Sequence, residues 1–452
     1  MNFPKHQTQD QPRNAAVLGA GDSGEAAAIL LADSGVRVTV LDSAGDDRLQ
    51  KKTEDLAARG IRLVAGPAAE RDESQYDLVV LSPGIDPAVP LVQHFLKRGM
   101  IMTGELELAY QYCECPIVAI TGTNGKTTTT QLVETMLNGC GVRTVAAGNI
   151  GPAFSARVRQ SENLDLMTLE VSSFQLETIH TFHPQIAVWL NFAPDHLDRY
   201  RSMEEYYAAK IRIFENQTAD DWAIVKLREK LPPLKARLIT FSAYASGGDF
   251  EFRDDAILYH GETVLRMSET NLRGAHNAEN LMAAMGVGVA RGLSFEKMRV
   301  PLCAYKALPH RCELVRTLEG VDYVNDTKAT NLDAMEKALA SETRPVVLIA
   351  GGKDKGFEFD SVTDLVASKC RAAVLIGEMA ERIEAMWKDR VRCVPAGRSL
   401  EKAVALARRE AQPGDVVLLS PGTSSFDMFK NYADRGNQFR ALVNALPQTA
   451  NS

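Results

Sequence analysis

The sequence lacks three features that would each point to a particular class of protein. It contains seven cysteines in 452 residues, and no two of them form a C-x-x-C pair. Neither a zinc knuckle nor a disulfide framework is therefore readable, and we expect reduced thiols. No apolar run approaches the roughly 18–20 residues that cross a bilayer. A basic excess is also missing, because the formal net charge is −7, so a nucleic-acid-binding surface is not indicated.

The amino-terminal segment and the composition indicate a cytoplasmic globular protein. The first residues, MNFPKHQTQDQPRN, are polar and have no apolar core behind their basic residues, so we do not expect a secretory signal. Hydrophobic residues make up 45% and charged residues 24% of the chain, as in ordinary soluble proteins. At roughly 150 residues per domain, the length predicts about three domains.

Short apolar strands alternate with helical stretches along the whole chain. They include AAVLG, VRVTVLD, YDLVVL, PIVAI, DLMTLE, PQIAVWLN, DWAIVK, RPVVLIA, RAAVLIG and GDVVLLS. Such near-continuous runs are typical of parallel strands buried on both faces. The sequence therefore predicts an α/β fold of three doubly wound units, with boundaries near Gly104 and in the segment 306–311. Residues 244–270 predict a small hairpin, with turns at Gly247-Gly248 and His260-Gly261.

A first glycine loop, GAGDSG at 19–24, lies between a strand and a helix, and Asp42 ends the next strand. This is the G-x-G-x-x-G pattern of dinucleotide sites, with an acid placed for a ribose hydroxyl. A dehydrogenase is one hypothesis from this end of the chain. The same loop would bind any diphosphate, because glycines and a helix N-terminus recognise phosphate rather than nicotinamide. A purely structural tight turn is the third possibility.

A second glycine loop, AITGTNGKTTTT at 119–130, follows the buried strand PIVAI. Its backbone N–H groups and Lys126 predict a cradle for the phosphates of a nucleoside triphosphate, and Thr127 would supply a hydroxyl ligand for Mg²⁺. The spacing departs from G-x-x-x-x-G-K-[ST], because that pattern would place its first glycine at Ile120 and the chain has Gly122 instead. The loop is a shortened variant.

Acidic and histidine side chains follow two of the neighbouring strands. Glu170 stands where the strand DLMTL stops, which makes it a candidate metal ligand beside the phosphate loop. Asp195, His196 and Asp198 cluster after the strand that ends at Asn191. For this cluster, a polar loop with a hydrogen-bonded histidine is an equally good interpretation.

Lys210 has the most unusual setting. In MEEYYAAKIRIFEN the i, i+4 series runs Tyr206, Lys210, Phe214, which places a lysine within the apolar stripe of a helix. Burial penalises the charged ammonium. A neutral amine could react with CO₂, and the resulting carbamate would be an additional carboxylate for a second metal ion. Alternatively, the lysine stem packs on the aromatic rings while its head reaches water.

Taken together, the motifs resemble those of the Mur ligases. The resemblance rests on GTNGKT, LEVSSFQLE, NFAPDHLDRY, GAHNAEN, LPHR, NDTKATN, GGKDKG and LSPGTSSFDMFKNYADRG, in this order, and extends from about residue 15 to 445. The match is closest to the members that add D-glutamate to UDP-N-acetylmuramoyl-L-alanine in peptidoglycan precursor synthesis. The shortened phosphate loop is the form that this family uses.

The resemblance implies three domains and a reaction. A Rossmann-like domain (1–104) would hold the UDP part, a central P-loop-type ATPase domain (105–308) would hold ATP, and a Rossmann-like domain (309–452) would hold the amino acid. ATP would phosphorylate the alanyl carboxylate, and the amine of D-glutamate would attack the acyl phosphate. The cofactors would be two Mg²⁺ ions and CO₂, the latter as the carbamate on Lys210. We expect a monomer.

The resemblance also implies roles for particular residues. Metal binding and catalysis would involve Lys126, Thr127, Glu170, His196 and Lys210. The ATP site would comprise Gly122, Thr123, Asn124, Gly125, Lys126, Thr127, Thr128, Asn277, Asn280, Arg311, Asp326 and Lys328. The sugar nucleotide would contact Asp22, Ser23, Asp42, Ser43, Gly84, Asn149 and His196. D-glutamate would be surrounded by Thr330, Lys355, Ser425 and Phe426.

Departures from the family pattern bear on the substrates. Some relatives place an arginine two residues after the aspartate that ends the second strand, and this chain has Ala44 there. A folylpolyglutamate synthase would share the shortened loop and the lysine but would lack the domain that precedes the loop. Sister Mur ligases would have all three domains, yet the D-N-P-R motif typical of the diaminopimelate-adding member is absent from the sequence. A non-enzymatic nucleotide-binding scaffold would not need Glu170, His196 and Lys210.

Overall fold

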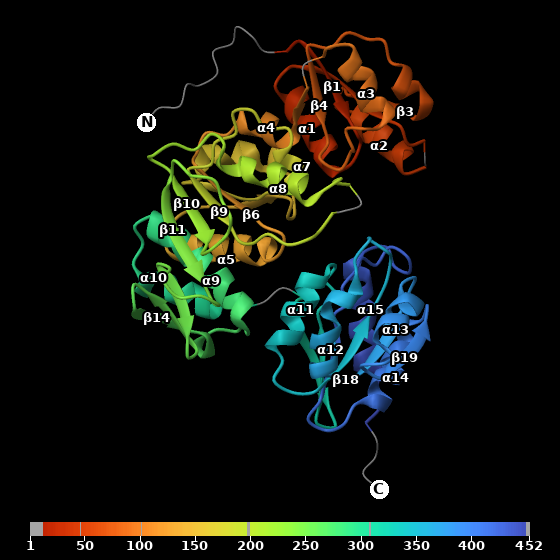
Figure 1. Ribbon diagram of the computed structural model, residues 1–452. Helices are drawn as coiled ribbons and strands as arrows, with labels where there is room; N and C mark the ends of the chain where they lie inside the picture. Colours follow the sequence, from red (N-terminus) through yellow and green to blue (C-terminus); the bar gives the residue numbers. More distant parts are fainter. Residues whose placement is uncertain (1–11, 46, 101, 197–198, 307–308, 449–452) are drawn as a thin grey trace. The chain divides into compact units, whose positions relative to one another are not determined.

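The computed structural model describes residues 12–448 except 46, 101, 197–198 and 307–308 (Figure 1). Two compact units form. The first comprises the chain up to residue 192 together with 204–269 and 279–304, and the second comprises 193–203, 270–278 and 305 onward. Three parallel-rich sheets with surrounding helices confirm the predicted α/β class. Part of the predicted boundary segment 306–311 lies outside the described residues.

The first sheet, in the first unit, is a five-stranded parallel sheet of order β3-β2-β1-β4-β5. Successive residues of β1 face opposite cores. Ala15 and Val17 pack in one hydrophobic cluster with Leu31, and Leu18 packs in another with Phe95, so helices cover both faces. The elements are β1 (Asn14–Leu18), α1 (Asp22–Asp33), β2 (Arg37–Asp42), α2 (Asp47–Ala57), β3 (Arg62–Ala65), η1 (Gly66–Arg71), β4 (Leu78–Leu81), α3 (Pro90–Lys97) and β5 (Met102–Gly104).

The second sheet, also in the first unit, has nine strands in the order β14-β13-β12-β11-β10-β9-β6-β8-β7. Strand β6 lies between β8 and β9, and both pairings are parallel. The strands are β6 (Ile117–Thr121), β7 (Ala146–Gly148), β8 (Met167–Glu170), β9 (Ile186–Trp189), β10 (Trp222–Lys226), β11 (Arg237–Ser242), β12 (Phe250–Arg253), β13 (Ala256–Tyr259) and β14 (Glu262–Arg266). The helices of this stretch are α4 (Glu105–Tyr110), α5 (Lys126–Gly139), α6 (Phe154–Arg157), η2 (Val158–Asn163), α7 (Ser173–Leu176), α8 (Met203–Ile211), η3 (Arg212–Phe214), η4 (Met267–Glu269), α9 (Ala275–Ala290) and α10 (Phe295–Ala304).

The predicted hairpin at 244–270 is present as the antiparallel strands β12, β13 and β14, which extend the second sheet. The turn predicted at His260-Gly261 is confirmed, with φ of 47° and 86° at these residues. The chain also bends at Gly247-Gly248, where Gly247 has a φ of 97°, but this bend precedes β12 and is not the hairpin turn. The chain instead reverses at Asp254 and Asp255, whose φ values of 49° and 65° suit a two-residue hairpin turn.

The third sheet, in the second unit, has the order β15-β16-β20-β17-β18-β19. Its pairs are parallel except the edge pair of β15 and β16. The elements are β15 (Glu313–Leu318), β16 (Val321–Asn325), α11 (Leu332–Ser341), β17 (Val346–Ala350), η5 (Phe359–Val362), α12 (Thr363–Lys369), β18 (Cys370–Ile376), α13 (Ala380–Trp387), β19 (Cys393–Gly397), α14 (Leu400–Glu410), β20 (Val416–Leu419) and α15 (Tyr432–Ala445).

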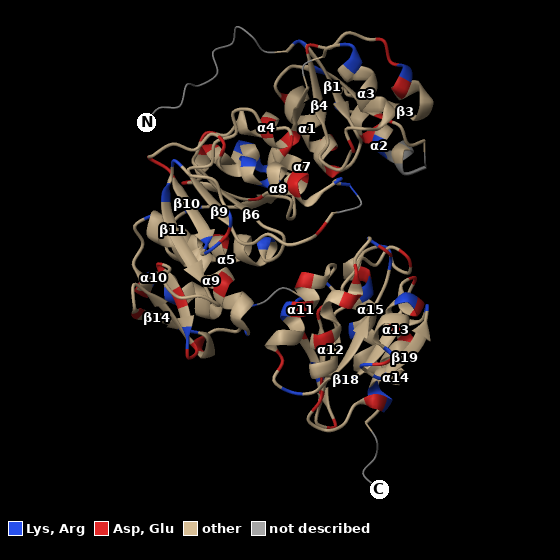
Figure 2. Ribbon diagram, in the orientation of Figure 1, with Lys and Arg blue, Asp and Glu red and all other residues tan. Residues whose placement is uncertain are grey.

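The surface of both units carries mixed charge. Figure 2 shows Asp and Glu interspersed with Lys and Arg on the helices and loops of each. Among the helices that the structure describes, none combines the length and the apolar character that a bilayer span would need. In each sheet, the loops after neighbouring parallel strands meet at one edge, where several of the candidate site residues lie.

Candidate functional site

The central glycine loop has the strand–loop–helix form that its sequence predicts. It joins β6 to α5, with φ of 154° at Gly122 and 84° at Gly125. A Cβ atom at Gly122 would lie 2.9 Å from Leu190 Cβ, and one at Gly125 would lie 2.4 Å from Asn280 Oδ1. Both positions therefore require glycine, and the loop presents its backbone at the N-terminus of the 14-residue helix α5, where anions bind.

Asn191, just beyond β9, holds this loop in place. Its Oδ1 accepts from the Asn124 N–H at 2.9 Å, its Nδ2 donates to the Asn124 carbonyl at 3.0 Å, and its own carbonyl accepts from the Thr123 N–H at 3.0 Å. From the sequence, Asn191 is recognisable only as the end of a strand. Its place just after a strand becomes informative only once β9 is known to pair with β6, the phosphate-loop strand.

Lys126 folds back over its own loop. Its Nζ donates to the carbonyl oxygens of Gly122 at 2.9 Å and Thr123 at 2.8 Å. These contacts keep the ammonium at the loop that would receive the phosphates. Phosphate oxygens would be stronger acceptors than neutral carbonyls for this group.

Glu170 and Asn149 form a buried pair at the end of β8. Glu170 is 2% exposed, and its Oε1 accepts from Asn149 Nδ2 at 2.7 Å. Its Oε2 is buried and has no hydrogen-bond partner among the described residues. Glu170 pairs in register with Ile120, two residues before Gly122. A buried, unsatisfied carboxylate oxygen beside a phosphate loop fits a divalent cation, which prefers oxygen ligands.

Lys210 lies on the buried side of α8, as the stripe predicts. It is 1% exposed, its Nζ donates to the Gly122 carbonyl at 2.9 Å, and it lies 4.8 Å from the centre of the Tyr206 ring. The Tyr206 hydroxyl lies 3.2 Å from Thr123 Oγ1. The snorkelling alternative is therefore wrong, and α8 contacts the phosphate loop through two side chains.

Asn280, expected near adenine, lies beneath the phosphate loop. Its Oδ1 accepts from Thr129 Oγ1 of α5 at 3.1 Å, and the residue is 6% exposed. Asn277 lies in the first turn of the same helix, and its Nδ2 donates to the Arg273 carbonyl at 2.8 Å. Residues 270–278 belong to the second unit and 279–304 to the first.

The first glycine loop has the geometry of a diphosphate site. Gly19 has a φ of 96°, and a Cβ on Gly24 would lie 1.9 Å from the Gly19 carbonyl oxygen. A Cβ on Gly21 would meet no atom within 4 Å, which leaves that side of the loop open. These are the three roles of the glycines in G-x-G-x-x-G: turn, ligand approach and helix packing.

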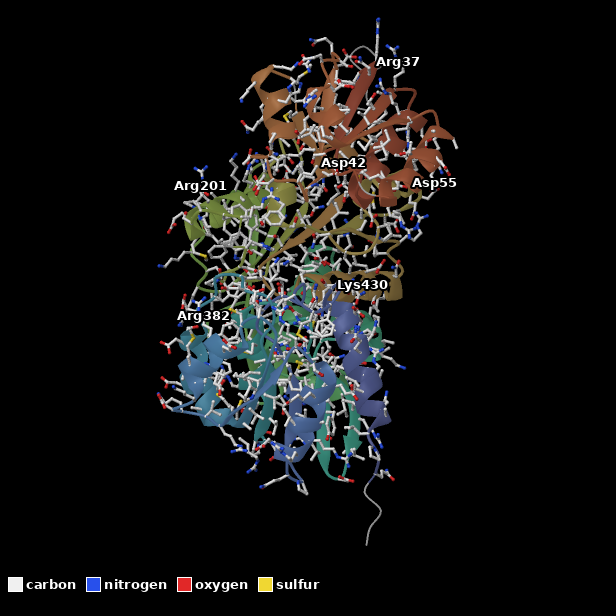
Figure 3. The ribbon with its side chains drawn as sticks, turned by 90° about the vertical axis from the view of Figure 1, so that its right-hand side faces the viewer. Arg37, Asp42, Asp55, Arg201, Arg382 and Lys430 are labelled. Carbon is white, nitrogen blue, oxygen red and sulfur yellow. The ribbon has the colours of Figure 1, made fainter. Side chains whose placement is uncertain are left out.

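Asp42 connects this loop to the end of β2 and is labelled in Figure 3. Its carboxylate accepts from the backbone N–H groups of Ala20 and Ala44, each at 2.8 Å. Ala44 thus contributes a backbone contact at the position where the family pattern allows an arginine. The other residues expected near the sugar nucleotide in this domain follow β2, β4 or the loop itself, and they are partly or fully exposed: Asp22, Ser23, Ser43 and Gly84.

Asp195 is the centre of a polar cluster in the second unit. Its Oδ1 accepts from Lys355 Nζ at 2.9 Å and its Oδ2 from Asn331 Nδ2 at 3.1 Å. Burial acts to raise the pKa of Asp195, but Lys355, His196 and Asn331 outweigh it and lower the pKa to about 2. His196 has a left-handed φ of 54°, and its Nε2 lies 3.8 Å from Asp195 Oδ2. Asp198 lies outside the described residues.

Three loops at the carboxyl edge of the third sheet carry most of the remaining predicted residues, and Arg311 precedes β15. Asp326 follows β16, Lys355 follows β17 and Ser425 follows β20, and these strands are neighbours. Ser425 is 2% exposed, whereas Phe426 is 67% exposed. The Thr330 N–H donates to the Lys328 carbonyl at 2.8 Å.

Asp326 is the buried acid of this edge. Its Oδ2 accepts from Ser420 Oγ at 2.9 Å and its Oδ1 from the Cys312 N–H at 3.2 Å. Burial raises the pKa of Asp326 to about 6, although these hydrogen bonds and Arg311 act in the opposite direction. The Lys328 ammonium lies 3.9 Å from the centre of the Tyr432 ring, a close cation–π contact.

The predicted residues thus gather as three groups, and the first glycine loop with Asp42 is one of them. Around Gly122, the first unit brings together Lys126, Lys210, Tyr206 and Asn191, with Glu170 on the adjacent strand. His196 and the residues expected at D-glutamate belong to the second unit. Within the described residues, no three His, Cys, Asp or Glu side chains converge as a ready metal site. The expected metal ligands are of a different kind, since they include a threonine hydroxyl and a modified lysine.

Comparison with known proteins covers the chain in three parts. The Mur ligase MurD-like N-terminal domain matches residues 13–104, the Mur ligase middle domain matches 120–288, and the Mur ligase glutamate ligase domain matches 310–422. The UDP-N-acetylmuramoylalanine–D-glutamate ligase of Pelotomaculum thermopropionicum is 40% identical over 448 residues, covering 96% of this chain and 98% of that protein. The enzyme of the same name from Koribacter versatilis is 42% identical over 449 residues, covering 96% and 98%.

Solved structures share the fold at low sequence identity. UDP-N-acetylmuramate-alanine ligase MurC from Thermotoga maritima has a TM-score of 0.63 and 17% identity, covering 96% of this chain and 100% of its own. A pseudomurein peptide ligase type C from Methanothermus fervidus has a TM-score of 0.61 and 16% identity, covering 96% and 99%. These likenesses support the three-sheet architecture.

Proposed function

The chain belongs to the Mur ligase family, and from this we propose that it uses ATP to join D-glutamate to UDP-N-acetylmuramoyl-L-alanine. The observation that carries the chemistry is the buried, unsatisfied Glu170 oxygen on the strand beside the phosphate loop. The full-length relatives named for this reaction support the choice of substrates. The product is a peptidoglycan precursor, so the activity would serve cell-wall synthesis and thereby cell shape and division.

The reaction needs an activated carboxylate. A carboxylate has no good leaving group, so an amine displaces it only after phosphorylation. ATP phosphorylates the alanyl carboxylate, and the amine of D-glutamate then attacks the acyl phosphate, forms the amide bond and expels phosphate. Most of the protein's contribution is to hold the reactants and to stabilise negative charge.

In the first unit, the phosphate loop residues 122–128 would hold ATP, with Lys126 turning from its own carbonyls to the phosphates. Thr127 and Glu170 would hold Mg²⁺, which supplies positive charge during phosphoryl transfer. Asn149, which keeps Glu170 in place at 2.7 Å, would also contact the sugar nucleotide. Asn280 would approach the adenine end of ATP and at the same time support the loop through Thr129.

Lys210 would carry a carbamate formed with CO₂. Its burial, with 1% of the residue exposed, favours a neutral or modified amine over a bare ammonium. The carbamate and His196 would hold a second Mg²⁺ ion. Rescue of Lys210→Ala by a small carboxylate tests this modification separately from the reaction.

In the second unit, Arg311, Asp326 and Lys328 would reach ATP, together with Asn277. Thr330, Lys355, Ser425 and Phe426 would surround D-glutamate, because a cation and hydroxyl groups suit its carboxylates. Lys355 would exchange its contact with Asp195 for the substrate. The proposed domains are 1–104 for the UDP part, 105–308 for ATP and 309–452 for the amino acid.

The proposal includes a monomeric enzyme that acts in the cytoplasm. Both ATP and the nucleotide substrate are cytoplasmic metabolites. The test is phosphate release from ATP in the presence of UDP-N-acetylmuramoyl-L-alanine and one amine at a time. D-glutamate should stimulate release, whereas L-glutamate, L-lysine and D-alanyl-D-alanine should not. Stimulation by another amine alone would assign the chain to a sister ligase.

A further inference from the structure

We infer that Lys52 is a positioning and charge-balancing residue of the sugar-nucleotide site, where it holds the first glycine loop and offsets its acidic side chains. The inference rests on the proposed function, because it assigns the diphosphate of the sugar nucleotide to this loop. Lys52 lies on α2 and was not singled out by any sequence motif.

The geometry places the Lys52 ammonium on the loop itself. Its Nζ donates to the Ala20 carbonyl at 2.9 Å and lies 2.7 Å from Glu25 Oε2 and 3.6 Å from Asp22 Oδ1. The Lys52 side chain is 29% exposed. Most of the side chain is therefore buried against the loop that joins β1 to α1.

Lys52 and Asp42 bind the two polar backbone groups of Ala20. The Ala20 N–H donates to Asp42 Oδ2 at 2.8 Å, while its carbonyl accepts from Lys52. Ala20 stands between Gly19 and Gly21, and Gly21 is the position that is open to an approaching ligand. Fixing Ala20 thus fixes the part of the loop where a diphosphate would lie against the backbone.

Lys52 reduces the electrostatic repulsion that the acidic side chains around the loop would exert on a diphosphate. Three carboxylates, on Asp22, Glu25 and Asp42, lie at or beside a loop whose glycine pattern suits an anion. A diphosphate at this loop would meet their negative charge. Lys52 is paired with two of the three, so it lowers the repulsion while contributing its own attraction to the ligand.

Two roles are possible for Lys52, bracing the loop or balancing its charge, and they predict different effects of Glu25→Gln on ligand binding. If the Lys52–Glu25 ion pair served only to brace the loop, Glu25→Gln would weaken ligand binding as Lys52→Met does. If charge balance matters, Glu25→Gln removes one repulsive carboxylate and leaves Lys52 with a surplus positive charge, so binding should be unchanged or tighter.

The experiment measures binding of UDP alone to the full-length protein and its variants by calorimetry. Lys52→Met should raise the Kd about tenfold, the scale of one charge-assisted contact at a half-exposed site, and should weaken its dependence on salt. Lys52→Arg should stay within roughly threefold of wild type. Lys97→Met, which removes a charge from α3 of the same domain, is the matched control and should leave the Kd unchanged.

Three results would overturn the inference: no UDP binding by the wild type, an unchanged Kd in Lys52→Met, or a loss in Glu25→Gln as large as in Lys52→Met. Each measurement omits ATP and amino acid. Failure of D-glutamate to stimulate phosphate release would therefore count against the proposed reaction, while the UDP titration would judge Lys52 independently.

Discussion

Replacement of Asn191 by leucine should weaken ATP binding by loosening the phosphate loop. The side chain makes two hydrogen bonds to the backbone of Asn124, at 2.9 and 3.0 Å. Each such bond contributes about 0.5–1.5 kcal/mol net, so their loss costs about 2 kcal/mol. If ATP binding must then order the loop without these hydrogen bonds, the KM for ATP should rise roughly 30-fold. The KM for the UDP substrate should change little.

The protein offers a matched control in Asn138. Its side chain makes the same pair of backbone hydrogen bonds, to the carbonyl and N–H of Thr144 at 3.0 and 3.1 Å, but at the opposite end of α5. Asn138→Leu should lower the thermal midpoint by a similar amount and leave the KM for ATP unchanged. Steady-state kinetics and thermal melts with and without ATP separate the two effects. Equal effects of both variants on the KM for ATP would refute the role given to Asn191.

Other predictions concern the lysines and one acid. Lys210→Ala should be nearly inactive and should regain activity when a small carboxylate such as acetate is supplied; no rescue would count against the carbamate. Lys126→Ala should abolish ATP turnover but keep the Kd for the UDP substrate, and loss of that binding would indicate misfolding instead. Because the pKa of Asp195 is lower in the folded state than in the unfolded state, the ionised carboxylate adds about 2 kcal/mol to the free energy of unfolding above about pH 4. This contribution is lost as the pH falls from about 4 to about 2. In denaturant titrations across this pH range, the free energy of unfolding of Lys355→Met should fall less steeply with pH than that of the wild type. The same pH dependence in both proteins would contradict the role given to Lys355.

The buried parallel strands could be predicted because their sequences consist of continuous apolar runs. β6, β17 and β20 are buried at every residue, and each was predicted. Edge strands could not be located in this way. β15 has half-exposed or exposed residues at all positions but one, so its sequence has no comparable run, and its antiparallel pairing depends on tertiary contacts.

The site was predictable where one short segment carries the chemistry. The glycine loop and the buried position of Lys210 follow from local sequence, because turn geometry and helical periodicity are local properties. Asn191 and Lys52 could not be found, because each acts on a segment 67 or 32 positions away in the sequence. Such pairings depend on strand order, which a single sequence does not specify.

The most direct test of the proposed reaction is to identify its product by mass. The chain is incubated with ATP, Mg²⁺, UDP-N-acetylmuramoyl-L-alanine and D-glutamate, and the nucleotide product and released phosphate are both quantified. The account predicts one added glutamyl residue for each phosphate released, and none when L-glutamate replaces D-glutamate. Phosphate release without an increase in the mass of the nucleotide substrate would contradict it.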